Sequence, residues 1–369
     1  THMITSIGLM SGTSCDGIDS SIIESDGENK VNFLGDLFFP YSPETKSKIR
    51  QLKDKINVIK DLKSNQAEIQ LIEKEITLLH AICVDLLIKQ LNFEKKNIDL
   101  IGFHGQTIFH SFKDKKTVQL GNAHLLSQLT NTNLVYNFRQ NDILNGGQGA
   151  PLTPIFHKFI KENLILENPI VFINIGGITN LTFIDNEKIY SFDSGPGNFL
   201  IDKFIQFKTQ NKIQYDDEGK IALSGQVDKN ILSSYLDDPY FLTKPPKSLD
   251  VNDFNLSPIR SLNLENGLAT LSELTVITIS NALNFFNKVP KKIILSGGGR
   301  KNKYLFNQIN NITQISTSTI DEYKINGDFV ESQAFAYLAI RSFLKKPISF
   351  PETTGVKNPS TGGNLIKIR

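Results

Sequence analysis

Residues 8–19 have the sequence GLMSGTSCDGID, a glycine-bearing turn between two short apolar runs. Thr5 to Leu9 precede the turn and residues 18–23 follow it, so the segment predicts two strands joined by a tight turn. Residues 31–39 predict a third strand, and residues 66–91 carry apolar residues at helical spacing. The chain therefore begins with the order strand, turn, strand, strand, helix.

The same order recurs in the second half of the chain. Residues 170–175, 179–184 and 188–192 predict three strands, with Gly176 and Gly177 as the turn between the first two. A helix is expected after Gly197. Further on, we expect a helix at 269–286, a strand at 292–295 and a final helix at 329–343. The repeat predicts two α/β lobes built alike with a cleft between them, the usual place for a small-molecule site.

Length, charge and apolar content exclude several classes of protein. The chain has 369 residues, which at about 150 per domain predicts two or three domains. Its net charge of +2 provides no large positive field, so we expect no nucleic-acid partner. It has no apolar run of about 18 residues and no secretion signal, so we expect a soluble cytoplasmic protein without a membrane partner. Cys15 and Cys83 cannot form a disulfide framework.

The first turn is rich in phosphate-binding chemistry. Backbone N–H groups and the hydroxyls of Thr13 and Ser14 would bind phosphate oxygens, and Asp16 would hold Mg²⁺. The alternative is a plain hairpin turned by Asp16 and Gly17. Neither a Walker A loop nor a dinucleotide fingerprint is present. A glycine turn between two strands in each lobe therefore points to a different ATP-binding architecture.

Two further glycine motifs have a functional and a plain interpretation. Asp193 ends a predicted strand just before a helix, whose N-terminus would keep the carboxylate ionised as a general base; alternatively, Asp193 only caps the helix. The glycines at 297–299 would admit a flat adenine ring, or form an ordinary strand-to-helix turn.

Several polar residues stand outside the glycine turns. The spacing of His104 and His110 matches no metal-ligand spacing, so hydrogen bonding to a polar substrate is favoured there. Arg139 would bind a carboxylate, or form an ordinary surface ion pair. Glu331 is by default a carboxylate at a helix start.

Taken together, six motifs resemble those of the anhydro-N-acetylmuramic acid kinase family, in order from about residue 7 to 363. They are GLMSGTSCDGID at 8–19, GFHGQT at 102–107, GGQGAP at 146–151, NIGGITN at 174–180, DSGPGN at 193–198 and SGGG at 296–299.

The resemblance implies an α/β fold of two ribonuclease-H-like lobes around a hinged cleft, as in actin, hexokinase and Hsp70. We expect the first lobe at 1–128 plus 345–369 and the second at 129–344. It implies an ATP- and Mg²⁺-dependent kinase, expected as a homodimer, that recycles cell-wall fragments. The enzyme would hydrolytically open 1,6-anhydro-N-acetylmuramic acid and phosphorylate it to N-acetylmuramic acid 6-phosphate.

By position, the resemblance makes Asp193 the catalytic base and assigns Thr107, Arg139 and Glu331 to the sugar. The nucleotide would contact Gly12, Thr13, Ser14, Cys15, Asp16, Gly17, Ile18, Asp19, Gly176, Gly177, Gly297 and Gly298. Two stretches depart from the family pattern, residues 245–250 and 358–363, and we expect neither to touch the catalytic set.

Two alternatives remain open. One is a kinase of another anhydro sugar such as levoglucosan, which has no carboxylate for Arg139 to bind. The other is a non-catalytic ATP-binding protein of the actin or Hsp70 type. Against this alternative, we find no long peptide-binding region after the two expected lobes.

Overall fold

The computed structural model describes residues 2–368, which form two compact units. Unit 1 contains the chain up to Leu164 and again from Phe329, and unit 2 contains Ile165–Asp328.

Unit 1 is built on a seven-stranded mixed sheet with the order β12-β6-β4-β1-β2-β3, and β5 pairs with β4. β1, β2 and β3 are antiparallel neighbours, whereas β4 runs parallel to β1 and β6 parallel to β4. The strands are β1 (Ile4–Ser11), β2 (Gly17–Ser25), β3 (Val31–Pro40), β4 (Leu100–Ser111), β5 (Lys116–Leu120), β6 (Leu134–Tyr136) and β12 (Asn364–Ile366).

Helices pack on both faces of this sheet. The helices of unit 1 are α1 (Pro43–Lys55), α2 (Lys60–Ser64), α3 (Gln66–Gln90), α4 (Ala123–Thr130), α5 (Gln140–Leu144), α6 (Pro154–Asn163), α12 (Val330–Phe343) and α13 (Pro351–Thr354). Ile7 and Leu9 of β1 share one apolar core with Ile76 of α3. The residue between them, Gly8, points the other way because side chains alternate along a strand.

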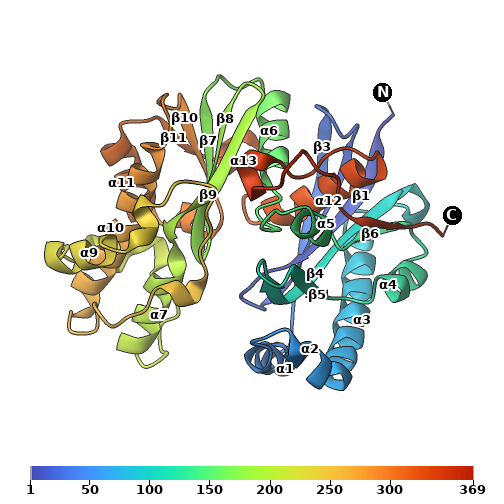
Figure 1. Cartoon of the computed structure of the whole chain (residues 1–369), viewed down its shortest axis with the longest axis horizontal. Coiled ribbons are helices and arrows are strands. Elements are labelled where there is room, and N and C mark those ends of the chain that lie inside the picture. Colours follow the sequence, from blue (N-terminus) through green and yellow to red (C-terminus); the bar gives the residue numbers. More distant parts are fainter. Residues whose placement is uncertain (1, 369) are drawn as a thin grey trace. The chain divides into compact units, whose positions relative to one another are not determined.

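Gly8 and Gly102 allow α12 to approach the sheet closely. A Cβ at Gly8 would lie 1.8 Å from the Ser332 carbonyl oxygen, and one at Gly102 would lie 2.4 Å from that of Phe335. The red helix α12 accordingly lies against the blue strand β1 (Figure 1). Gly8 of the first motif therefore serves packing.

Unit 2 repeats the arrangement with five strands in the order β11-β10-β7-β8-β9. β7, β8 and β9 are antiparallel, and β10 and β11 continue in parallel from β7. The strands are β7 (Ile170–Ile175), β8 (Ile178–Asp185), β9 (Lys188–Pro196), β10 (Lys292–Ser296) and β11 (Thr317–Thr319).

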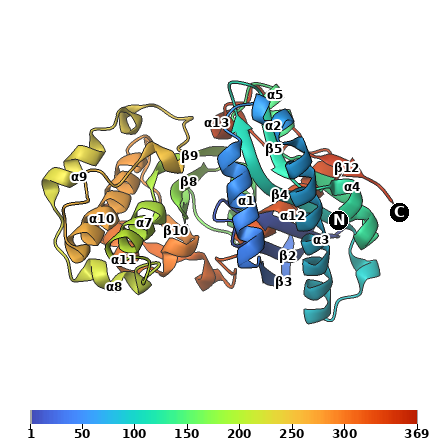
Figure 2. The ribbon, with the colours of Figure 1, turned by 90° about the horizontal axis from the view of Figure 1, so that it is seen from below.

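Helix α10 is central to unit 2 and contacts α7, α8, α9 and α11 (Figure 2). The helices are α7 (Asn198–Lys208), α8 (Lys220–Leu223), α9 (Lys229–Leu236), α10 (Leu264–Leu283) and α11 (Lys303–Thr313). Short 3₁₀ segments are η1 (Lys95–Asn97) in unit 1 and η2 (Asp217–Gly219), η3 (Pro239–Leu242), η4 (Val251–Asp253), η5 (Gly298–Lys301) and η6 (Ile320–Tyr323) in unit 2.

The α/β class and the repeated arrangement are confirmed, because both sheets have three antiparallel strands followed by two parallel ones. The compact units divide the chain at other residues than the expected domains. Residues 129–164 lie in unit 1, where β6 pairs with β4, and residues 329–344 lie there because α12 packs on β1.

Candidate active site

The first glycine turn exposes its polar side chains and buries its apolar ones. The Cys15 N–H donates to the Gly12 carbonyl over 3.1 Å, so the turn lies at 12–15, ahead of the expected Asp16 and Gly17. Thr13, Ser14 and Asp16 are exposed, whereas the side chains of Cys15 and Ile18 are buried. Cys15 and Ile18 therefore offer a ligand only their backbone.

Helix α1 brings three cations to this turn, which sequence reasoning missed. Lys46 pairs with the Asp16 carboxylate, and the Arg50 Nη2 donates to the Ser14 carbonyl over 3.3 Å. Lys53 Nζ lies 3.5 Å from the Thr13 carbonyl. Their spacing of four and three residues puts them on one helix face and was the available signal.

The predicted nucleotide glycines fall into two groups. Apart from the adjoining residues, no atom of the described chain lies within 4 Å of a Cβ built at Gly12, and the closest at Gly176, Gly177 and Gly298 are at 3.6, 3.6 and 3.8 Å. At Gly17 the same Cβ would lie 2.2 Å from the Phe39 carbonyl oxygen. Gly12, Gly176, Gly177 and Gly298 therefore leave room for a ligand beside the backbone.

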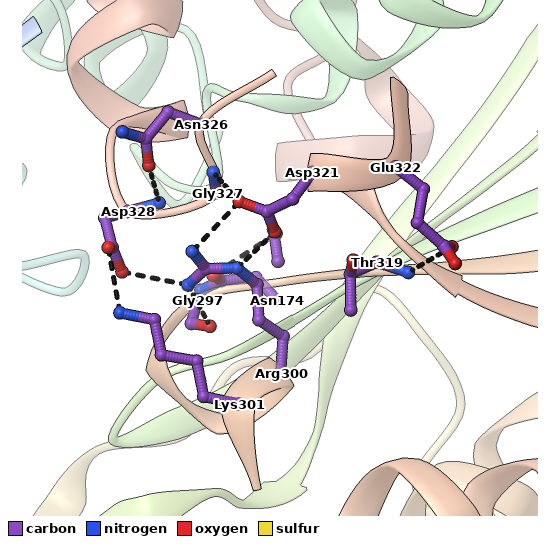
Figure 3. Close-up of polar contacts among 11 residues, drawn as sticks. Asn174, Gly297, Arg300, Lys301, Thr319, Asp321, Glu322, Asn326, Gly327 and Asp328 are labelled. Carbon is purple, nitrogen blue, oxygen red and sulfur yellow. Dashed lines mark hydrogen bonds and ion pairs between the residues drawn. The ribbon is translucent and has the colours of Figure 1, made fainter. Parts of the chain in front are cut away.

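The turn after β10 is held by a buried arginine (Figure 3). Arg300 donates from Nε and Nη2 to Asp321 over 2.6 and 3.2 Å, and from Nη1 to Asp328 over 2.9 Å. Nη1 also donates to the Gly297 carbonyl over 3.1 Å. Gly297 has φ of +80°, and a Cβ there would lie 2.5 Å from the Asn174 Oδ1, so this glycine belongs to the packing of the turn.

A hollow of about 310 Å³ opens beside the same turn. Its lining includes Gly298, Asn302, Asn198 and Asp202. Gly298, predicted to lie on the adenine side, therefore borders an open volume within unit 2.

Asp193 lies inside β9 and not at a helix N-terminus. α7 begins at Asn198 and its N-cap is Gly197, so the capping interpretation is wrong. Burial raises the pKa of Asp193 to about 7, although one hydrogen bond from the Leu249 N–H (2.8 Å) opposes the rise. The expectation that the helix keeps this carboxylate ionised is also wrong, because desolvation is the larger effect.

The segment after residue 239 encloses Asp193. The Tyr240 hydroxyl donates to the Asp193 carbonyl over 2.6 Å, and the Asp193 N–H donates to the Lys247 carbonyl over 3.3 Å. Leu249, which donates to the carboxylate, lies within residues 245–250, where the sequence departs from the family pattern. The expectation that this departure leaves the catalytic set untouched is therefore wrong for the position of Asp193.

The three predicted sugar residues all lie in unit 1. Thr107 is on β4, and its hydroxyl accepts from the Gln119 side chain over 3.3 Å. Arg139 precedes α5, and Glu331 is in the first turn of α12. Desolvation by the surrounding protein raises the pKa of the Glu331 carboxyl, and the positive charge of Arg139 opposes the rise. The two side chains are therefore close enough to interact electrostatically.

Asp16, whose carboxylate pairs with Lys46, is the residue predicted to hold a magnesium ion. Residues 2–368 contain no group of three or more His, Cys, Asp or Glu side chains placed to hold a metal by themselves. Mg²⁺ in kinases is bound by one or two carboxylates together with substrate phosphates. An exposed Asp16 beside the phosphate-type turn fits that requirement.

The family model described as anhydro-N-acetylmuramic acid kinase matches residues 4–367. The chain belongs to the anhydro-N-acetylmuramic acid kinase family. The curated anhydro-N-acetylmuramic acid kinase of Pelagibacter ubique is 48% identical over 98% of both chains, and that of Agrobacterium fabrum is 37% identical over 98% of both.

Among solved structures, component A of the (R)-2-hydroxyglutaryl-CoA dehydratase of Acidaminococcus fermentans aligns with 93% of this chain and all of its own. Its TM-score is 0.45 at 10% identity.

Membership of the anhydro-N-acetylmuramic acid kinase family confirms the predicted resemblance and the prediction of a kinase. Within residues 2–368, none of the helices has the length and apolar character that crossing a bilayer requires.

Proposed function

We propose that this chain hydrolytically opens 1,6-anhydro-N-acetylmuramic acid and phosphorylates it to N-acetylmuramic acid 6-phosphate, using ATP, in the recycling of cell-wall fragments. The observation that carries the proposal is the carboxyl of Asp193. Its pKa of about 7 is the value at which a general base combines proton affinity with availability near neutral pH.

In the proposed reaction, Asp193 takes a proton from a water molecule as the water oxygen bonds to the anomeric carbon. The bond from that carbon to the bridging 6-oxygen breaks, and the freed oxygen takes the γ-phosphoryl group while ADP leaves. Since only the ionised carboxylate accepts the proton, kcat should rise with pH through about 7 and then level off. A pH–rate profile without this rise would contradict the role.

The nucleotide would be bound by both glycine turns. Exposed hydroxyls at Thr13 and Ser14 and the open backbones of Gly12, Gly176 and Gly177 support phosphate binding. Asp16 would hold Mg²⁺, which neutralises phosphate charge during transfer. The open volume at Gly298 supports adenosine binding. We also propose a cytoplasmic homodimer.

The sugar would be bound by Thr107, Arg139 and Glu331, with Arg139 on the lactyl carboxylate. Loss of a charge-assisted contact costs about 1.5–3 kcal/mol, so Arg139→Ala should raise KM for this sugar roughly 10- to 150-fold. The melting temperature of the Arg139→Ala variant serves as the control for folding. An unchanged KM would remove Arg139 from the sugar site.

The direct test is ATP turnover with 1,6-anhydro-N-acetylmuramic acid, with levoglucosan and no sugar as controls. We expect turnover only with the muramic sugar, with the phosphate on its 6-oxygen by mass spectrometry and NMR. Preference for levoglucosan would favour the other anhydro-sugar kinase, and no sugar-dependent turnover would favour the non-catalytic ATP-binding protein.

A further inference from the structure

His104 directly contacts Arg139 in unit 1. The histidine is 5% exposed, and its Nε2 lies 3.1 Å from the Arg139 Nε. Its Nδ1 lies 2.7 Å from the Gly105 carbonyl oxygen. Each partner has only one hydrogen-bonding capacity, since a carbonyl accepts and an arginine N–H donates.

These two contacts fix the tautomer of the ring. Nδ1 must carry a proton to donate to Gly105, and Nε2 must keep its lone pair to accept from Arg139. A second proton on the ring would direct an N–H at an N–H and place two cations in contact. Burial and the charge of Arg139 accordingly lower the pKa of His104 to about 3.

A second contact holds the other side of the guanidinium. The Arg139 Nη1 donates to the Gly149 carbonyl over 2.9 Å, and the Gly149 N–H donates to Asp142 over 2.7 Å. The centroid of the Phe335 ring of α12 lies 4.7 Å from the centroid of the His104 ring and 5.8 Å from the Arg139 guanidinium carbon. Among the described residues, none accepts a hydrogen bond from Nη2 of Arg139, which leaves that nitrogen for a ligand.

We propose that His104 is a positioning residue, whose neutral ring holds the Arg139 guanidinium so that its Nη2 faces the carboxylate of the sugar. The assignment rests on the proposed sugar site. It replaces the expectation that the histidine bonds to substrate: His104 acts through Arg139. Its loss should therefore raise KM for the muramic sugar and leave kcat and KM for ATP nearly unchanged.

The tautomer is tested in the ligand-free full-length chain by ¹⁵N NMR of the histidine rings, with the His104 signals assigned by their loss in His104→Gln. We expect a proton on Nδ1, none on Nε2, and no titration between pH 5 and 9. A His104 ring that titrates near pH 6.5, or that carries its proton on Nε2, would overturn the proposal without any reference to activity.

Kinetics then separate positioning from structure. In His104→Gln the side-chain carbonyl replaces the Nε2 acceptor, whereas His104→Leu offers none. We expect KM for the sugar to rise roughly 10-fold or more in His104→Leu and to stay near the original value in His104→Gln. Equal KM values in the two variants would contradict the proposal, and so would a loss confined to kcat.

Arg139→Ala distinguishes the two possible failures. If Arg139→Ala raises KM for the sugar and His104→Leu does not, the role of His104 is wrong while the sugar site stands. If neither variant changes KM, the sugar site itself is wrong. Should His104→Leu fail to fold, the NMR experiment on the original chain still decides.

Discussion

Asp193 shows why a carboxylate's neighbours in sequence do not determine its chemistry. In the sequence, Asp193 stands beside glycines and just before a predicted helix, and the N-terminus of that helix was expected to keep the carboxylate ionised. In the structure, Tyr240 and Leu249, 47 and 56 residues further along the chain, hydrogen-bond to Asp193, and desolvation outweighs the opposing effect of the Leu249 hydrogen bond. Position on a strand could be predicted from sequence, but the enclosure by a distant segment could not.

The raised pKa of Asp193 has a consequence for stability. Its folded pKa of about 7 lies above the value of about 3.9 for an unfolded chain, so its stabilising effect is complete below pH 4 and is lost as pH rises to 7. Asp193→Asn removes the buried charge and keeps an acceptor for Leu249. We therefore expect a higher melting temperature than the original chain at pH 8, with the difference shrinking at pH 5. A variant that melts lower at pH 8 would contradict the enclosed carboxylate.

The glycine turns show how one kind of motif serves two purposes. Sequence reasoning assigned six glycines to the nucleotide, but the structure separates Gly12, Gly176, Gly177 and Gly298, which are open, from Gly17 and Gly297, which are packed. The turns themselves were predictable from the apolar runs on either side. Which glycines face open space could not be predicted, because the answer depends on distant segments, such as β3, that pack against them.

Gly12→Ala and Gly17→Ala form a matched pair that tests this division. The Cβ at residue 12 meets nothing in the described chain, so Gly12→Ala should leave the melting temperature within a few degrees and raise KM for ATP. At residue 17 the Cβ would lie 2.2 Å from the Phe39 carbonyl oxygen, so Gly17→Ala should lower the melting temperature markedly. An equal loss of stability in both variants would refute the proposed difference.

The Arg300 turn gives a second test of local architecture. Arg300→Ala removes the donors to Asp321, Asp328 and the Gly297 carbonyl, and should cost about 1–3 kcal/mol of unfolding free energy and raise KM for ATP. The control is Lys301→Ala, whose exposed side chain pairs with Asp328 and should change stability by less than about 1 kcal/mol. Denaturant unfolding curves decide; similar losses in both variants would show that Arg300 does not hold the turn.

The repeated topology was the most predictable property of the whole chain. The alternation of apolar runs and turns predicted three antiparallel strands in each half, and both sheets contain them. The limits of the units were harder to predict, because β6 and α12 join unit 1 through contacts with β4 and β1 that lie far away in sequence. The cations of α1 and the pairing of His104 with Arg139 were missed for the same reason.

The central claim is that a carboxyl group with a raised pKa, Asp193, activates water in an anhydro-sugar kinase. It is tested most directly by kcat of Asp193→Asn at pH 8, with sugar binding measured by calorimetry. General-base catalysis contributes about 10²- to 10⁴-fold, so kcat should fall at least about 10²-fold while sugar binding and folding persist. A variant that keeps nearly its full kcat would contradict the account.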